Sequence, residues 1–169
     1  QINWENDYLY LGKNLIKVNN TIEHANIKDG TLSIAGGAFS NCTNLKQIEI
    51  TPSVINIGDS AFTGCTNLTE VLNASGVVNI GETAFFNCTS LTEFYIPQNV
   101  VSIGMGCFIN CNNLTKVFIE NNVLNIEYDT FPTYNKFFAL IVEQDSYAHL
   151  YAILNQVQFW CFGDIAIIF

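Results

Sequence analysis

The stretch Leu91–Asn113, LTEFYIPQNVVSIGMGCFINCNN, carries one complete copy of the pattern that decides the fold. Phe94 and Ile96 are apolar at alternating positions, which is typical of a short strand with one buried face. A second extended piece covers Val100–Ile103, and Gly104 then lets the backbone bend. The remaining residues suffice for one helical turn at most. The stretch therefore predicts one coil made of a strand, a second extended piece and a short helical turn.

This pattern repeats along the chain with a period of 23 residues. The period places similar side chains in fixed columns, which are Phe39, Phe62, Phe85, Phe108 and Phe131; Cys42, Cys65, Cys88 and Cys111; Ile34, Ile57, Ile80, Ile103 and Ile126; and Leu45, Leu68, Leu91 and Leu114. One unit cannot bury its own apolar residues, whereas coils stacked roughly 4.7–4.9 Å apart pack each column on itself. The sequence therefore predicts an α/β solenoid of about five turns that is rich in β-structure and has short helical turns.

We expect the whole chain to form a single repeat domain with a cap at each end, because an open stack exposes its apolar columns there. The predicted parts of this 1–169 domain are an N-terminal cap over 1–21, the repeats over 22–136, and the last strand with a C-terminal cap over 137–169. Alternating apolar residues over Tyr8–Val18 predict a hairpin that turns at 12–14. A helix over Tyr147–Asn155, N-capped by Asp145 or Ser146, is predicted within the C-terminal cap.

The repeat resembles the BspA-type leucine-rich repeats of bacterial surface proteins. The core of that pattern, I-G-x-x-A-F-x-x-C-x-x-L, is matched closely over Ile57–Leu68, Ile80–Leu91 and Ile103–Leu114. The resemblance implies a right-handed leucine-rich-repeat superhelix in a secreted or cell-surface protein of a bacterium or parasite, with adhesion to host matrix proteins as the usual proposal. It does not imply an enzyme. Asn73 replaces an inward isoleucine and Glu127 replaces a glycine, so we expect the repeat to be distorted there.

The composition bears on the partners that the chain can take. Fifteen acidic residues stand against six lysines and no arginine, and the net charge of −9 has the wrong sign for neutralising phosphates, so no nucleic acid partner is expected. No stretch reaches the roughly 18 apolar residues of a membrane span, and no secretory signal is recognisable, so an extracellular or cell-surface location rests on the resemblance. The low proportion of charged residues, 12%, and the open repeat edges favour self-association.

The cysteines and histidines carry no clear signal for chemistry. In a solenoid the cysteine column stacks with parallel side chains, which do not face one another as a disulfide requires, so we expect buried free thiols. Cys107 and Cys111 form the one pair spaced i, i+4, and His24 and His149 lie near opposite ends of the chain. We therefore predict no metal site, no cofactor and no nucleophile activated by histidine.

The outward side of the predicted strands carries the candidate binding residues. The column between the two buried positions is Asn26, Glu49, Leu72, Tyr95, Phe118 and Ile141, and the column beside it is His24, Gln47, Glu70, Glu93, Lys116 and Ala139. An exposed apolar ladder with tyrosine and phenylalanine is typical of a partner surface, although aromatic residues also favour strands and the C-terminal cap can equally cover them. The candidate ligand-binding residues are Leu72, Tyr95 and Phe118, flanked by Glu70 and Glu93.

Three hypotheses for function follow from these observations. The first is a non-enzymatic module that binds an extracellular protein or glycan through the outward columns and needs no cofactor. The second is a structural spacer within a larger surface protein, with no dedicated ligand. The third is an enzyme, in which Glu70 and Glu93, one turn apart, form the kind of carboxylate pair that glycosidases use.

Overall fold

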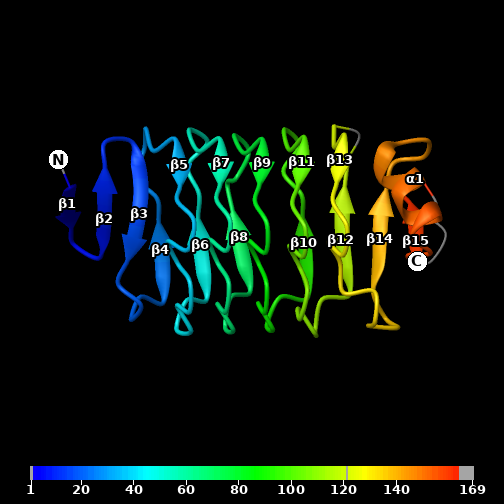
Figure 1. Cartoon of the computed structure of the whole chain (residues 1–169), viewed down its shortest axis with the longest axis horizontal. Coiled ribbons are helices and arrows are strands. Elements are labelled where there is room, and N and C mark those ends of the chain that lie inside the picture. Colours follow the sequence, from blue (N-terminus) through cyan, green and yellow to red (C-terminus); the bar gives the residue numbers. More distant parts are fainter. Residues whose placement is uncertain (1, 121, 164–169) are drawn as a thin grey trace.

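The coils of the chain stack side by side along one axis, from β1 at one end to α1 at the other (Figure 1). The computed structural model describes residues 2–120 and 122–163, so the predicted cap residues 164–169 lie outside the described part. Each coil pairs with the next at positions one period apart, as Ser33 does with Asn56 and Glu93 with Lys116. The predicted leucine-rich-repeat solenoid is therefore confirmed, with about six turns where about five were expected.

One side of the stack is an eight-stranded sheet in the order β1-β2-β3-β5-β7-β9-β11-β13. Its strands are β1 (Ile2–Glu5), β2 (Tyr8–Leu11), β3 (Asn14–Val18), β5 (Ser33–Ile34), β7 (Asn56–Ile57), β9 (Asn79–Ile80), β11 (Ser102–Ile103) and β13 (Asn125–Ile126). The first three strands pair antiparallel, and the pairs from β3 onward are parallel. The predicted N-terminal hairpin is confirmed as β2 and β3, and β1 adds an outer strand that the sequence analysis did not predict.

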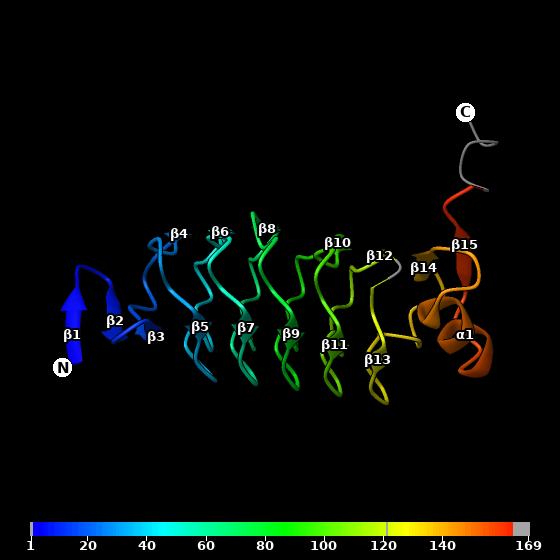
Figure 2. The same ribbon diagram turned by 90° about the horizontal axis from the view of Figure 1, so that it is seen from above.

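The opposite side of the stack carries six coil strands and one strand of the C-terminal cap, divided between two parallel sheets (Figure 2). The first sheet contains β4 (His24–Asn26), β6 (Gln47–Glu49) and β8 (Glu70–Leu72), and the second contains β10 (Glu93–Tyr95), β12 (Lys116–Ile119), β14 (Ala139–Val142) and β15 (Phe159–Cys161). We refer to this side as the strand side.

The bend that follows each glycine is built from tight turns in place of the expected helical turn. Alternate amides bond within the segment, as Cys42 N–H does to Phe39 C=O at 3.0 Å, while those between them bond to the next coil, as Phe39 N–H does to Ala61 C=O at 2.8 Å. A helix cannot form there because every second N–H belongs to the neighbouring coil. Asn41 and the later asparagine at Asn87 take left-handed φ values near 60°, a conformation that asparagine tolerates well.

The core consists of the stacked columns that the period predicts. The five phenylalanine rings of the first column are almost fully buried and lie nearly parallel, with neighbouring centroids between 4.8 and 5.9 Å apart. The glycines that follow three of the column isoleucines, Gly58, Gly81 and Gly104, let successive coils approach closely, since a methyl group added at Gly104 would lie 2.6 Å from the Glu82 nitrogen. The repeat therefore uses phenylalanine to fill the axis and glycine to set the coil spacing.

The C-terminal cap begins with α1 (Tyr147–Leu154), and the predicted helix is confirmed. Ser146 is its N-cap and accepts a hydrogen bond from the His149 N–H at 3.1 Å. Tyr151 lies edge-on to Phe131, with ring centroids 5.9 Å apart. The helix thus closes the end of the phenylalanine column.

Candidate binding surface on the interrupted strand side

The strand side is interrupted between β8 and β10. A main-chain bond between consecutive coils recurs from Thr69 N–H to Lys46 C=O (2.9 Å) and from Thr115 N–H to Thr92 C=O (2.8 Å), but the described residues show no such bond from Thr92 to Thr69. One strand-side sheet ends at β8 and the other begins at β10, while β9 and β11 stay paired on the opposite side. The solenoid is therefore continuous on one side and opens on the other (Figure 2).

Asn73 is one cause of this interruption. Neighbouring coils bury Ile50 and Ile96 at the same position, whereas Asn73 is exposed and its side-chain amide donates to the Glu49 carboxylate. An amide buried without a partner would cost free energy, so the chain turns this side chain to the surface. The third coil consequently lacks one of the apolar anchors that draw the other coils together.

Phe94 is the second cause. It is the largest side chain in its inward column, whose other members are Ala25, Ile48, Val71, Val117 and Leu140. Its ring packs against both Phe85 and Phe108, with centroids 4.9 Å from each. A bulky ring in the fourth coil and a missing anchor in the third therefore act together to separate β8 from β10.

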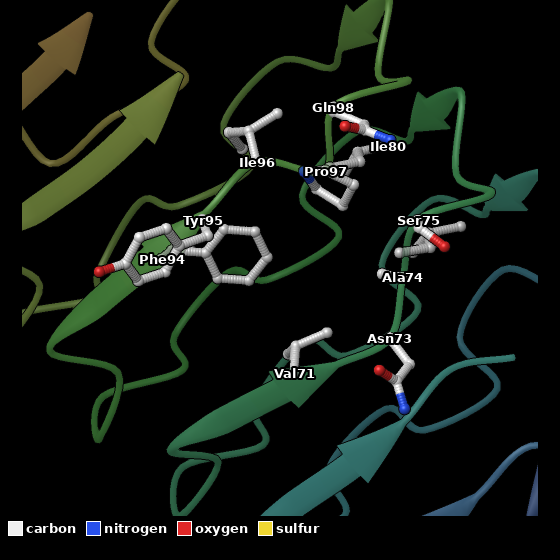
Figure 3. Close-up of a pocket in the computed structure, with 11 residues that line it drawn as sticks. Val71, Asn73, Ala74, Ser75, Ile80, Phe94, Tyr95, Ile96, Pro97 and Gln98 are labelled. Carbon is white, nitrogen blue, oxygen red and sulfur yellow. The ribbon is translucent and has the colours of Figure 1, made fainter. Parts of the chain in front are cut away.

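The separation leaves a groove, termed the β8–β10 gap, bounded by Thr69–Leu72 and Leu91–Tyr95. Figure 3 shows Val71 on one edge of the gap and Phe94 and Tyr95 on the other. It holds two adjoining hollows of about 360 and about 320 Å³, both of which are lined by Val71, Phe94 and Tyr95. Val71 is half-buried, whereas every other member of its column is buried. The interruption therefore opens part of the core to solvent.

Tyr95 and Phe118, two of the predicted binding residues, stack face to face on the outward surface. Their ring centroids are 4.2 Å apart and their planes differ by 1°. Tyr95 is 65% exposed, and Leu72 is 39% exposed on the far side of the gap. The predicted ladder thus has the expected register but is interrupted between Leu72 and Tyr95, because β8 and β10 do not pair.

The outward ladder continues into the C-terminal cap, which the sequence analysis missed. Ile141 is buried, and Trp160 of β15 pairs in register beside it with 43% of its surface exposed. The 23-residue period could not predict the place of Trp160, because β15 follows α1 and lies outside the repeat. Because the cap buries Ile141, we define the outward stripe as Tyr95, Phe118 and Trp160.

The two predicted glutamates each contact a neighbour within their own sheet. Glu70 accepts a hydrogen bond from the Gln47 side chain at 2.9 Å, and Glu93 forms an ion pair with Lys116 at 3.0 Å. Both glutamates line the first of the two hollows. The structure therefore places them at the same end of the β8–β10 gap, on opposite edges.

The five cysteines within the repeats are buried thiols, as predicted. The Sγ atoms of Cys65, Cys88 and Cys111 donate to phenylalanine carbonyls of an earlier coil at 3.1–3.2 Å. Burial raises the pKa of Cys65 and of Cys111 to about 12, so these thiols stay protonated at neutral pH and are poor nucleophiles.

Two further searches bear on chemistry and location. The described residues contain no group of three or more His, Cys, Asp or Glu side chains arranged to hold a metal ion. No helix within residues 2–120 and 122–163 has the length and apolar character to cross a membrane.

A second exposed apolar column lies on the opposite side of the stack. It precedes the short strands there and comprises the exposed residues Leu32, Ile55, Val101 and Leu124 and the half-buried Val78. Leu124 is the most exposed member, at 67%. The period carries the signal for this column, but the sequence analysis did not select it.

Comparison with known proteins agrees with the fold. The family model for the BspA type leucine rich repeat region matches residues 10–137 in 6 copies. The crystal structure of a leucine-rich repeat protein from T. pallidum superposes with a TM-score of 0.72 at 25% identity, covering 83% of this chain and 67% of that chain. No curated protein matches the chain.

Two further solved structures share the fold at lower identity. The pneumococcal vaccine antigen PcpA superposes with a TM-score of 0.74 at 16% identity, and this chain covers 47% of its length. A leucine rich cell surface protein from Faecalibacterium prausnitzii gives a TM-score of 0.61 at 20% identity, with 87% of this chain and 55% of that chain covered. Since the family model covers most of the chain, the protein belongs to the BspA-type leucine-rich repeat family.

Proposed function

We propose that the chain is a non-enzymatic repeat module of a secreted or cell-surface protein, and that it binds an extracellular protein or glycan through the outward stripe, Leu72 and the two glutamates. The observation that carries this proposal is the flat, stacked pair of Tyr95 and Phe118 on the strand side, at the edge of the β8–β10 gap. Tyrosine is enriched among the interface residues that dominate binding energy, and a ring already held by stacking loses little conformational freedom when a partner binds.

The relatives support a surface location for such a module. The structure from Faecalibacterium prausnitzii is that of a cell surface protein, and PcpA is a vaccine antigen. Adhesion to host or matrix proteins is the form of binding that we propose first.

The test is binding of the purified chain to immobilised extracellular-matrix proteins and mucin, beside the variant Tyr95→Ser, Phe118→Ser. The matched control is Tyr128→Ser, because Tyr128 is as exposed as Tyr95, at 71%, but follows β13 in the other sheet. We expect saturable binding that weakens at least about 30-fold in the double variant and is kept in the control. Each variant should have the melting temperature of the parent chain. If the double variant melts at a lower temperature, the single variant Tyr95→Ser is used in its place.

Two results would overturn this proposal. Equal binding by the parent and a folded double variant would show that the outward stripe is not the contact surface. If the chain binds no panel member at concentrations on the order of 10⁻⁵ M, the structural spacer is favoured.

A further inference from the structure

The two edges of the β8–β10 gap present main-chain groups that have no strand partner. In a parallel sheet, alternate residues of a strand direct their N–H and C=O groups to one neighbour, and the residues between them serve the other. Leu72 C=O accepts from Ile50 N–H at 2.8 Å, so β8 uses Leu72 toward β6. The N–H and C=O of Val71 therefore point into the gap.

The same alternation applies on the other edge. Ile96 N–H donates to Phe118 C=O at 3.0 Å, which directs the main chain of Ile96 and of Phe94 toward β12. The main-chain groups of Glu93 and Tyr95 consequently point back across the gap. Two strand edges with complementary donors and acceptors thus face one groove.

The walls of the gap are apolar, while one end of it is acidic. Val71 and Phe94 line its walls (Figure 3), and Ile57 and Ile80 are buried apolar residues that line one of its hollows. Glu70 and Glu93 flank the end at which both strands begin. The chain as a whole is acidic as well, with fifteen acidic residues and six lysines.

We propose that the β8–β10 gap takes up an extended polypeptide segment of a protein partner, which joins the strand side by main-chain pairing with one or both edges. This inference rests on the proposed function and names the chemistry of the partner. Strand addition to an exposed edge supplies affinity through the main chain and specificity through alternate side chains. The segment has apolar residues facing Val71 and Phe94, and a basic residue beside Glu70, whose hydrogen-bond donor Gln47 is neutral, whereas Glu93 already forms an ion pair with Lys116.

Hydrogen exchange with a defined peptide tests this proposal. The probe is a synthetic peptide of about nine residues, a length usual for strands, with the sequence Lys-Thr-Val-Thr-Val-Thr-Val-Thr-Lys. The matched control peptide is N-methylated at every Val and Thr, which keeps all side chains and charges but removes the main-chain donors toward both edges. We expect the parent peptide to slow exchange of the Val71 and Tyr95 amides, and the methylated peptide to bind at least about tenfold more weakly.

A variant of the chain gives a second readout that does not depend on the control peptide. Asn73→Ile restores the residue type that the neighbouring coils bury, so it should draw β8 toward β10 and narrow the gap. We expect this variant to bind the parent peptide at least about tenfold more weakly while melting no lower than the parent chain. The matched control, Asn20→Ile, changes the same residue type at an exposed position between β3 and β4, away from the gap, and should leave peptide binding unchanged.

Three outcomes would overturn the inference. Equal binding of the methylated peptide would show that side chains or charge, and not main-chain pairing, hold the probe. Slowed exchange confined to β1, the outer edge of the first sheet, would place the peptide elsewhere. If protection of the Val71 and Tyr95 amides increases with protein concentration in the absence of peptide, the occupant of the gap is a second copy of this chain.

The proposed function fails separately from this inference. If the Tyr95→Ser, Phe118→Ser variant keeps matrix binding while the methylated peptide loses affinity, the outward stripe is rejected and the gap remains. If the variant loses matrix binding while both peptides bind equally, the stripe stands and strand addition is rejected.

Discussion

Phe85→Ala should be among the most destabilising substitutions in the chain. The Phe85 side chain has no exposed surface, and its ring stacks on Phe62 and Phe108 at centroid distances of 5.1 and 5.5 Å. It also lies against Phe94 at 4.9 Å. Truncating a buried phenylalanine costs about 3–5 kcal/mol, and three ring neighbours place Phe85 near the upper end of that range.

Phe39→Ala provides the matched comparison, because Phe39 is equally buried but has one aromatic neighbour, Phe62, at 4.8 Å. Aromatic pairs contribute about 0.5–1.5 kcal/mol each beyond burial, so Phe85→Ala should cost about 1–3 kcal/mol more than Phe39→Ala. Urea unfolding followed by circular dichroism measures both, with the exposed Phe137→Ala as the neutral control. A cost for Phe85→Ala equal to or below that for Phe39→Ala would refute the phenylalanine column as the main axis of stability.

Three other predictions concern the coil spacing, the thiols and the cap. Gly81→Ala should lower the free energy of unfolding by about 1–3 kcal/mol, because the added methyl would lie 2.6 Å from the main chain of the preceding coil; Gly163→Ala, which meets nothing within 4 Å, is the unfolding control and should change little. Burial raises the pKa of Cys65 and Cys111 from 9.0 to about 12. The contribution of these thiols to the free energy of unfolding is therefore complete below about pH 9 and falls by about 1.4 kcal/mol for each thiol per pH unit above it. The loss of melting temperature between about pH 8 and pH 10 should be smaller when both are changed to Ala. Ser146→Ala should cost about 0.5–2 kcal/mol by removing the N-cap of α1, and unchanged amide exchange in the helix would contradict this role.

The regular parts of the fold could be predicted from the sequence because they follow the period. The columns of Phe, Cys and Ile, the hairpin over Tyr8–Val18 and the helix after Ser146 each have a local pattern. The helical turn expected after each glycine is a set of tight turns, since the neighbouring coil takes alternate amides and residue patterns do not report such bonds.

The candidate site was predicted in part. The outward register of Tyr95 and Phe118 followed from strand alternation, and Asn73 was recognised as a departure from the repeat. The gap itself could not be predicted, because it depends on how Asn73 in one coil and Phe94 in the next change the separation of two strands. Trp160 was missed because it joins the outward stripe through a strand that lies outside the repeat.

The most direct measurement is native-state hydrogen exchange of three threonine amides in the free chain. Thr69, Thr92 and Thr115 each follow a leucine and stand in the same column, so their intrinsic exchange rates are closely similar. The amides of Thr69 and Thr115 donate across to the preceding coil, at 2.9 and 2.8 Å, whereas the described residues show no bond from Thr92 to Thr69. We predict that Thr92 exchanges much faster than the other two, as an open edge requires. Equal protection of all three amides would mean that β8 and β10 are joined, and it would remove the groove on which the binding account depends.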